Sequence, residues 1–304
     1  MTKKPLKNIA SSIRQRLLDI SRQQKVDFNY LLNRFANERF LYRFSQSSHA
    51  TLFIIKGAFL FLIWTGTSHR PTRDIDFLAL EDLNFERYMG IFKEVCDISS
   101  DDGIIFNRES VTAEAIRDNQ AYGGIRIFVE GALTNARFRL QFDIGFGDEV
   151  TPESPIIEIP SLLNFPSPWM RIYPKETLIS EKYEALVKLG IINSRMKDFY
   201  DLWYLSHHFA FDGEILSRAI QSTFRRRKTP LPQSLPTALT DEFADDSDKK
   251  KQWKAFISQK ELEQNVLALH DVITRLKLFL IPPTKTLLEG KSFKRKWDPE
   301  TGWV

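Results

Sequence analysis

Arg70-Pro-Thr-Arg-Asp74-Ile-Asp76-Phe-Leu-Ala-Leu80 places two acids at positions i and i+2 at the start of an apolar run. On a β-strand these side chains leave from the same face, roughly 6–7 Å apart along the chain. Two carboxylates held in this way can bind one or two divalent ions, which take oxygen ligands and bridge the oxygens of a transferring phosphoryl group. The stretch therefore predicts a strand that carries a metal-dependent site.

A third acid follows on another predicted strand. The segment Arg137-Phe-Arg-Leu-Gln-Phe-Asp143 alternates cleanly between polar and apolar residues, with Asp143 on the polar face. A carboxylate on a neighbouring strand would complete a metal site and could act as the base for an attacking hydroxyl.

Each acid alone has a structural explanation. Asp74 could form an ion pair with Arg70 or Arg73, and Asp143 could be a solvated strand residue. The three acids together, with Lys56-Gly57 upstream, favour an active site.

Lys56-Gly57-Ala58 lies between the predicted strand 52–55 and the apolar segment 59–64. A strand-to-helix turn of small residues lets backbone N–H groups approach a phosphate, and a helix N-terminus adds a favourable dipole. The alternative is a packing glycine beside a lysine that extends along the surface.

A charged cluster follows on two predicted helices. Asp198 and Asp201 share a helix face at i and i+3, Arg195 precedes them, and Glu181-Lys182 lies on the helix before. The cations could bind a triphosphate, with the acids orienting them; a structural salt-bridge network explains the same residues equally well.

Composition indicates a folded chain without a membrane segment. The 304 residues include 24 Phe and 6 Trp, and the net charge of +4 allows a polyanionic partner without requiring one. Cys96 is the only cysteine, which excludes an intrachain disulfide and fits a reducing compartment. We expect no signal peptide and a cytoplasmic protein, since the N-terminus lacks an apolar region and the longest apolar run spans only 58–64.

The chain predicts an α+β fold: N-terminal helices over residues 1–48 that pack on the core, an α/β domain with a mixed sheet and flanking helices over 49–165, and a mostly helical domain over 166–304. Asp27 is the expected N-cap of the second helix, Asn193-Ser194 the expected cap between two later helices, and the prolines of 152–168 a connector. Residues 229–250 should form an exposed loop, one helix should run from about Lys251 to Leu280, and the basic tail from Thr284 should be loosely attached.

The remaining motifs give weaker indications of function. Arg225-Arg-Arg-Lys228 could contact RNA phosphates, but a solvated helix end is the favoured explanation. The histidines lack metal-ligand spacing, and His207-His208 should lie on a helix surface. No Walker A, G-x-S-x-G or G-x-G-x-x-G sequence is present.

At these residues the chain resembles the AbiEii toxin family, nucleotidyltransferases of the DNA polymerase β superfold that act as toxins of bacterial type IV toxin–antitoxin and abortive-infection systems. The resemblance covers roughly residues 30–210. It rests on Lys56-Gly57-Ala58, residues 70–76, Gln141-Phe-Asp-Ile-Gly-Phe-Gly-Asp148, and Glu181-Lys182 with Ser194-Arg-Met-Lys-Asp-Phe-Tyr-Asp201.

The resemblance implies a nucleotidyl transfer from an NTP, with Mg²⁺ or Mn²⁺ as cofactor, tRNA as the acceptor in studied relatives, and a cognate antitoxin. It implies that Asp74, Asp76 and Asp143 bind the metal, with Asp143 also serving as base and Lys182 as a further catalytic group. The nucleotide-binding residues it implies are Lys56, Gly57, Arg73, Lys182, Arg195, Lys197, Asp198 and Asp201.

One departure is Ala58, where the family usually has a second glycine and superfamily members often have serine. Alanine keeps the turn small but supplies no hydroxyl. Two alternatives to a nucleotidyltransferase stay open: another metal-dependent phosphoryl-transfer enzyme (a nuclease or a kinase), and a non-catalytic nucleotide- or RNA-binding module on the same fold.

Overall fold

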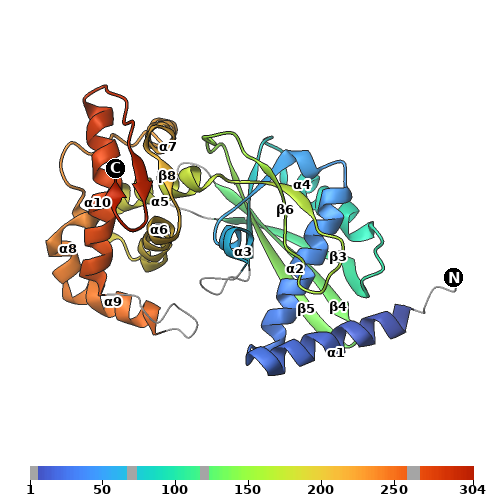
Figure 1. The fold of residues 1–304 in the computed structure, drawn as a ribbon. Helices are drawn as coiled ribbons and strands as arrows, with labels where there is room; N and C mark the ends of the chain where they lie inside the picture. The colour runs from blue at the N-terminus through green and yellow to red at the C-terminus, as the bar shows by residue number, and fades with distance from the viewer. Residues whose placement is uncertain (1–5, 67–73, 117–122, 259–267) are drawn as a thin grey trace. The chain divides into compact units, whose positions relative to one another are not determined.

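A seven-stranded mixed sheet forms the centre of the first of two units in the computed structural model, which describes residues 6–66, 74–116, 123–258 and 268–304 (Figure 1). The first unit comprises Met1–Gly147 and Pro155–Ile172, and the second comprises Asp148–Ser154 and Tyr173–Val304. No helix among the described residues is long and apolar enough to cross a membrane.

The described elements of the first unit, in chain order, are α1 (Leu6–Gln24), α2 (Phe28–Gln46), a 3₁₀ turn (Ala50–Leu52), β1 (Phe53–Lys56), α3 (Phe59–Thr65), β2 (Asp74–Ala79), α4 (Phe85–Asp97), β3 (Ile104–Ile116), β4 (Gly124–Leu133), β5 (Ala136–Phe146), β6 (Ile156–Glu158) and β7 (Trp169–Ile172). The strand order in the sheet is β3-β4-β5-β2-β1-β7-β6. The pairs β2–β5 and β1–β7 are parallel and the other pairs are antiparallel.

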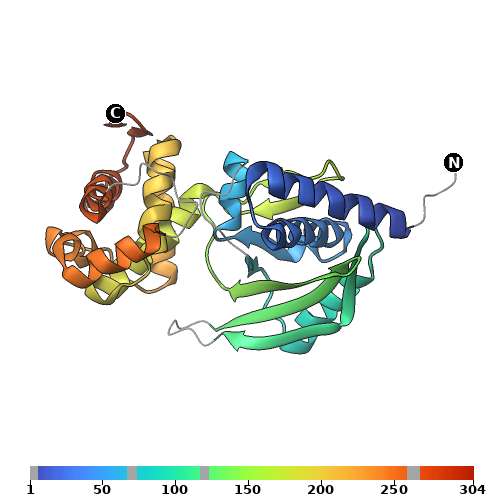
Figure 2. The same cartoon turned by 90° about the horizontal axis from the view of Figure 1, so that it is seen from below.

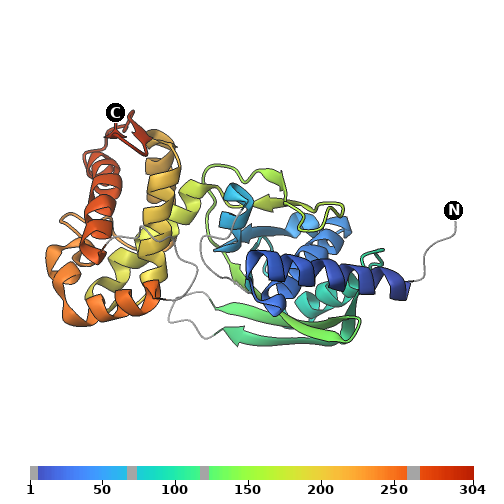
Figure 3. The same cartoon turned by 60° about the horizontal axis from the view of Figure 1, so that its bottom comes forward.

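One face of this sheet is apolar, and helices cover it. Phe40 of α2 and Phe92 of α4 both pack on Phe142 of β5, with ring centroids 4.7 and 5.1 Å apart. Figures 2 and 3 show α1 and α2 lying along the same side of β4 and β5. The alternation in residues 137–143 thus places its apolar side chains in the core and its polar side chains on the opposite face, as predicted.

Helix α2 begins where the sequence predicts. The Asp27 carboxylate accepts a hydrogen bond from the Tyr30 backbone N–H at 3.0 Å, which confirms the N-cap. The proline-rich segment predicted as a connector contains strand β6 and leads into β7, which adds to the sheet beside β1.

A buried charge cluster joins α2 to the loop before β3. Asp102 has no exposed surface; it accepts from Arg39 Nε at 2.8 Å and from Arg43 Nη1 and Nη2 at 2.7 and 2.9 Å. Burial raises the pKa of Asp102, but the hydrogen bonds and charges of Arg43 and Arg39 outweigh burial and hold the pKa below its usual value.

The described elements of the second unit are α5 (Lys175–Leu189), a 3₁₀ turn (Gly190–Ile192), α6 (Met196–His208), β8 (Phe211–Asp212), α7 (Gly213–Arg226), a 3₁₀ turn (Thr237–Leu239), α8 (Asp241–Asp245), α9 (Ser247–Ile257), α10 (Leu269–Leu288), β9 (Lys296–Asp298) and β10 (Gly302–Trp303). Strands β8, β9 and β10 form a small antiparallel sheet. The prediction of a mixed sheet with flanking helices followed by a mostly helical part is confirmed.

Three predictions for this unit are wrong. Residues 229–250 are not an exposed loop, because they contain a 3₁₀ turn, α8 and the start of α9, and bury Leu239 and Phe243 completely. Helices α9 and α10 are separate elements rather than one helix. Helix α6 has Arg195 as its N-cap residue; Asn193 lies outside the helix and accepts from the Arg195 backbone N–H.

The predicted helix end at Leu280 and the loose tail are also wrong, for a shared reason. Helix α10 continues through both prolines to Leu288. Pro283 cannot donate to the Phe279 carbonyl, and the Trp303 indole N–H donates to it instead at 3.0 Å. Trp297 donates its indole N–H to the Ser206 carbonyl at 2.7 Å and is 1% exposed, so the tail is part of the core.

We expect Asp102→Asn to destabilise the protein by about 3 kcal/mol at pH 7, because it removes the carboxylate that two buried guanidinium groups share. Urea unfolding followed by circular dichroism measures the change. Asp97→Asn is the control, since Asp97 pairs with Arg108 on the surface and should cost no more than about 1 kcal/mol.

Acidification should reduce the difference in the free energy of unfolding between the wild type and Asp102→Asn. A carboxyl whose pKa is depressed in the folded state contributes stability above its unfolded pKa, and that stability is lost as the pH falls through the folded pKa. A penalty that stays constant from pH 7 down to about pH 2 would contradict this assignment of the stability to the Asp102 charge.

Candidate active site

A row of charged side chains crosses four adjacent strands of the large sheet. Lys56 of β1 lies opposite Asp76 of β2, Asp76 lies beside Asp143 of β5, and Asp143 lies opposite Arg126 of β4. Neighbouring strands are about 5 Å apart, so two adjacent anions lie between two cations on the polar face.

The three predicted acids come together, two of them in this row and Asp74 next to it. One carboxylate oxygen from each of Asp74, Asp76 and Asp143 lies within 4.8 Å of the other two, and all three side chains are half-buried. The parallel pairing of β2 with β5 causes this, because it sets Asp76 beside Asp143 and Asp74 beside Gln141. A cluster of carboxylate oxygens is the donor set that Mg²⁺ and Mn²⁺ prefer, so these residues fit the divalent ion.

Because Gly57 has no side chain, the Asp76 carboxylate can lie directly against the turn. Its φ is +75°, and a Cβ atom at this position would lie 1.8 Å from Asp76 Oδ2. The turn that ends β1 therefore passes directly against the Asp76 carboxylate, which only a glycine permits. Lys56 reaches along the same face to Gly145 of β5, where an added Cβ would be 3.3 Å from the lysine Nζ.

Arg126 is a site residue that the sequence analysis missed. Its Nε and Nη2 each donate to one oxygen of Asp143 at 2.8 Å, and Gln141 Nε2 donates to the same carboxylate at 3.1 Å. The hydrogen bond to Asp143 raises the pKa of Arg126, with the charges of Asp143, Glu114 and Asp74 adding to it. These contacts fix the orientation of the third carboxylate.

The charged residues that the sequence predicts on two adjacent helices lie together in the second unit. Lys182 Nζ of α5 lies 2.8 Å from Asp198 Oδ1 and 2.8 Å from Asp201 Oδ2 of α6, and both acids are fully buried. Arg195 Nε lies 2.6 Å from the other Asp198 oxygen. Burial raises the pKa of Asp198, but Lys182 and Arg195 outweigh it and the net pKa is lowered. The cluster is therefore an ion-pair network that joins α5 to α6.

Two predicted nucleotide-binding residues do not join these groups. Lys197 is exposed on α6. Arg73, like Arg70, lies outside the described residues.

The basic run 225–228 is only partly a solvated helix end. Arg227 is mostly buried and contacts Asp148 at 2.9 Å, Glu184 at 3.0 Å and Glu181 at 3.3 Å. Burial lowers the pKa of Arg227, but the three acids outweigh burial and raise it. Arg227 therefore ties α7 to α5, a role that the local sequence does not distinguish from solvent exposure.

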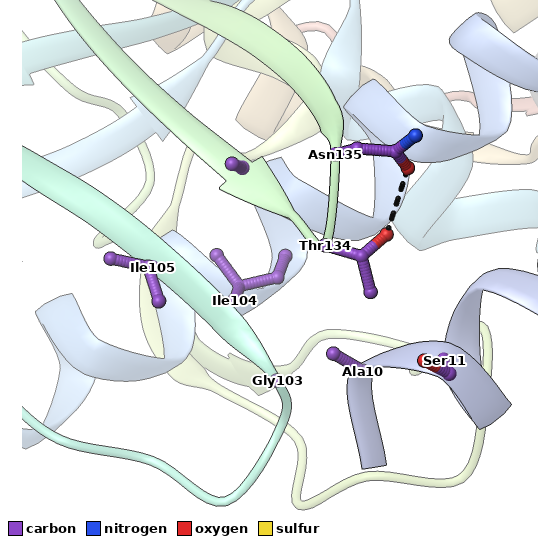
Figure 4. Close-up of a pocket in the computed structure, with 8 residues that line it drawn as sticks. Ala10, Ser11, Gly103, Ile104, Ile105, Thr134 and Asn135 are labelled. Carbon is purple, nitrogen blue, oxygen red and sulfur yellow. Dashed lines mark hydrogen bonds between the residues drawn. The ribbon is translucent and has the colours of Figure 1, made fainter. Parts of the chain in front are cut away.

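A pocket of about 530 Å³ lies elsewhere in the first unit, between α1 and the turn joining β4 to β5 (Figure 4). Ala10, Ile104 and Ile105 face it, with Thr134 and Asn135 at the turn. None of the described residues that line it is ionisable, so it lacks the groups for acid–base or metal chemistry.

The family model for "Nucleotidyl transferase AbiEii toxin, Type IV TA system" matches residues 39–274. This span includes the three acids, the Lys56-Gly57 turn and the Lys182 network. The chain belongs to this family of nucleotidyltransferase toxins, and it is a nucleotidyltransferase.

Solved structures with a similar fold come from two bacteria. JHP933 from Helicobacter pylori has 18% sequence identity and a TM-score of 0.47, covering 83% of this chain and 90% of that chain. The nucleotidyltransferase toxin MenT4 from Mycobacterium tuberculosis H37Rv has 15% identity and a TM-score of 0.49, covering 92% of this chain and 99% of that one. No curated protein matches the chain at a significant level.

We expect Gly57→Ala to weaken Mn²⁺ binding at least tenfold, because the new methyl group displaces the Asp76 carboxylate. Electron paramagnetic resonance titration measures free Mn²⁺ directly. Gly66→Ala is the matched control: its φ is +73°, so the backbone strain is the same, but its Cβ would meet nothing within 4 Å. Equal Mn²⁺ affinities in the two variants would refute the steric argument.

Lys182→Met should destabilise the second unit by about 3 kcal/mol, since it leaves two buried carboxylates without their shared cation. Lys197→Met removes the same charge from the exposed side of α6 and should change stability by less than about 0.5 kcal/mol. Thermal unfolding of both variants tests this, and equal melting temperatures would show that the Lys182 network contributes nothing.

Proposed function

We propose that this enzyme transfers a nucleoside monophosphate from an NTP to a hydroxyl of tRNA, with Mg²⁺ held by Asp74, Asp76 and Asp143. The observation that supports the proposal is the approach of the three half-buried carboxylates within 4.8 Å of one another on one face of the sheet. A divalent ion bound there supplies charge neutralisation at the phosphates.

Residues of the sheet supply the other parts of this reaction. Lys56 and the Gly57 turn border Asp76 on the β1 side. We assign the triphosphate to this side, because a cation and backbone N–H groups would bind its phosphates there. Asp143, on the β5 side, accepts the proton of the acceptor hydroxyl. The acceptor oxygen then bonds to the α-phosphorus while the bond to the bridging oxygen breaks, and pyrophosphate leaves.

Arg126 takes a positioning role in this proposal. Its two hydrogen bonds at 2.8 Å hold the Asp143 carboxylate in one orientation before substrate arrives. Catalysis of phosphoryl transfer is mainly positioning and charge stabilisation, so a prealigned base lowers the reorganisation that the reaction requires.

The proposal also includes a protein partner and a cellular location for the enzyme. A type IV toxin works against a cognate antitoxin, and we propose such a protein as the partner of this enzyme, with both located in the cytoplasm, where NTP and tRNA are available.

Asp76→Asn should lower transfer at least 1,000-fold without unfolding the protein, because it removes one metal-binding charge from a half-buried surface position. The assay incubates enzyme, Mg²⁺, total bacterial tRNA and each α-labelled NTP in turn. Asp82→Asn, an exposed acid in the loop after β2, is the control and should retain full activity.

The outcomes separate the proposal from its alternatives. Label on tRNA from the wild type alone supports transfer and names the nucleotide, whereas activity retained by Asp76→Asn refutes the assigned site. Shortened RNA without label would indicate a nuclease, and NTP binding without turnover on any acceptor would indicate a binding module.

A further inference from the structure

A polar pocket of about 640 Å³ in the first unit is lined by Asp74, one of the three clustered carboxylates. Asp74 of β2 lies beside Gln141 of β5 in the parallel strand pair, and both residues line the pocket. Residues 137–139, which precede Gln141 on β5, also line it.

Two arginines on the polar face of β5 line this pocket. Arg137 and Arg139 lie in one row with Gln141 and Asp143, because alternate residues of a strand share a face, and successive members of the row are about 6–7 Å apart. Both side chains are exposed, and among the described residues neither forms an ion pair, although Glu130 faces Arg139 across the β4–β5 pair. They contrast with Arg126, Arg195 and Arg227, each of which contacts a carboxylate.

The pocket also offers a flat stacking surface and amide groups. The Arg139 guanidinium lies over the Phe128 ring, 3.8 Å from its centroid. Asn29 and Asn33, one turn apart on α2, also line the pocket. Arginine planes and aromatic rings stack nucleobases without sequence preference, and arginines bind phosphates in bidentate geometry.

We propose that this pocket binds the single-stranded 3′-terminal segment of an RNA acceptor. Its terminal hydroxyl would lie at Asp143, phosphates of the preceding nucleotides at Arg139 and Arg137, and a base against the Arg139–Phe128 pair. The assignment of the reacting hydroxyl rests on the proposed function. The direction follows from the sheet, because Lys56 and Gly57 border Asp76 on the β1 side and the arginines lie on the β5 side.

The test measures RNA binding separately from transfer. A 5′-fluorescein-labelled RNA of eight nucleotides is titrated with protein by fluorescence anisotropy, without NTP and over a range of salt concentrations. The variant is Arg137→Ala/Arg139→Ala. The control Arg22→Ala/Arg87→Ala removes the same charge from exposed positions on α1 and α4.

The pocket variant should bind the RNA at least tenfold more weakly than wild type. The slope of log K against log salt concentration should fall in magnitude by about 1.4, since each lost phosphate contact on a single strand contributes about 0.7. The control should stay within twofold of wild type, and NTP affinity should be unchanged in both variants. Arg139→Lys should keep the salt slope but lose affinity, because lysine keeps the charge without the planar stack.

Three results would overturn the inference: unchanged RNA affinity in the pocket variant, an equal loss in the control, or no RNA binding by the wild type with label transferred to a protein instead. Failure of the proposed function gives a different result. In that case the wild type binds RNA through the arginines but transfers no label from any NTP.

Discussion

The parallel pairing of β2 with β5 is the constraint on which the rest of the site depends. It pairs residues 67 positions apart in the chain, and so sets Asp76 beside Asp143. Once that register exists, the antiparallel neighbours β1 and β4 bring Lys56 and Arg126 to the two ends of the same row. A shift of one residue would turn every side chain of β2 to the other face and bury both acids in the phenylalanine core.

The charged residues of the protein fall into two groups that differ in burial. In the first group, acids and bases are buried together: Arg39 and Arg43 share Asp102 in the first unit, and in the second unit Lys182 is shared by two carboxylates and Arg227 by three. Such groups hold helices in place, because removing one partner leaves an uncompensated buried charge. In the second group, Asp74, Asp76 and Asp143 of the first unit are only half-buried, so their charges can exchange their partners for a ligand. Burial thus separates framework charges from those available for chemistry.

The sequence predicts local features well and non-local ones poorly. The alternation in 137–143 and the acids at 74 and 76 are local patterns, and both occur on the strands predicted. Arg126 could have been found, because the turn at Thr134-Asn135 makes paired residue numbers sum to 269 and so sets Arg126 opposite Asp143. Arg227 and the helix that passes Pro283 depend on groups far along the chain, Glu184 and Trp303, which no local pattern reveals.

The uneven distribution of aromatic rings has a practical consequence for spectroscopy. The sheet core is built from phenylalanine, whereas Trp203, Trp253, Trp297 and Trp303 all lie in the second unit. The first unit has Trp64 and Trp169, and Trp169 is 57% exposed. Tryptophan emission will therefore report mainly on the helical unit, and the unit that carries the carboxylates could melt with little change in the signal.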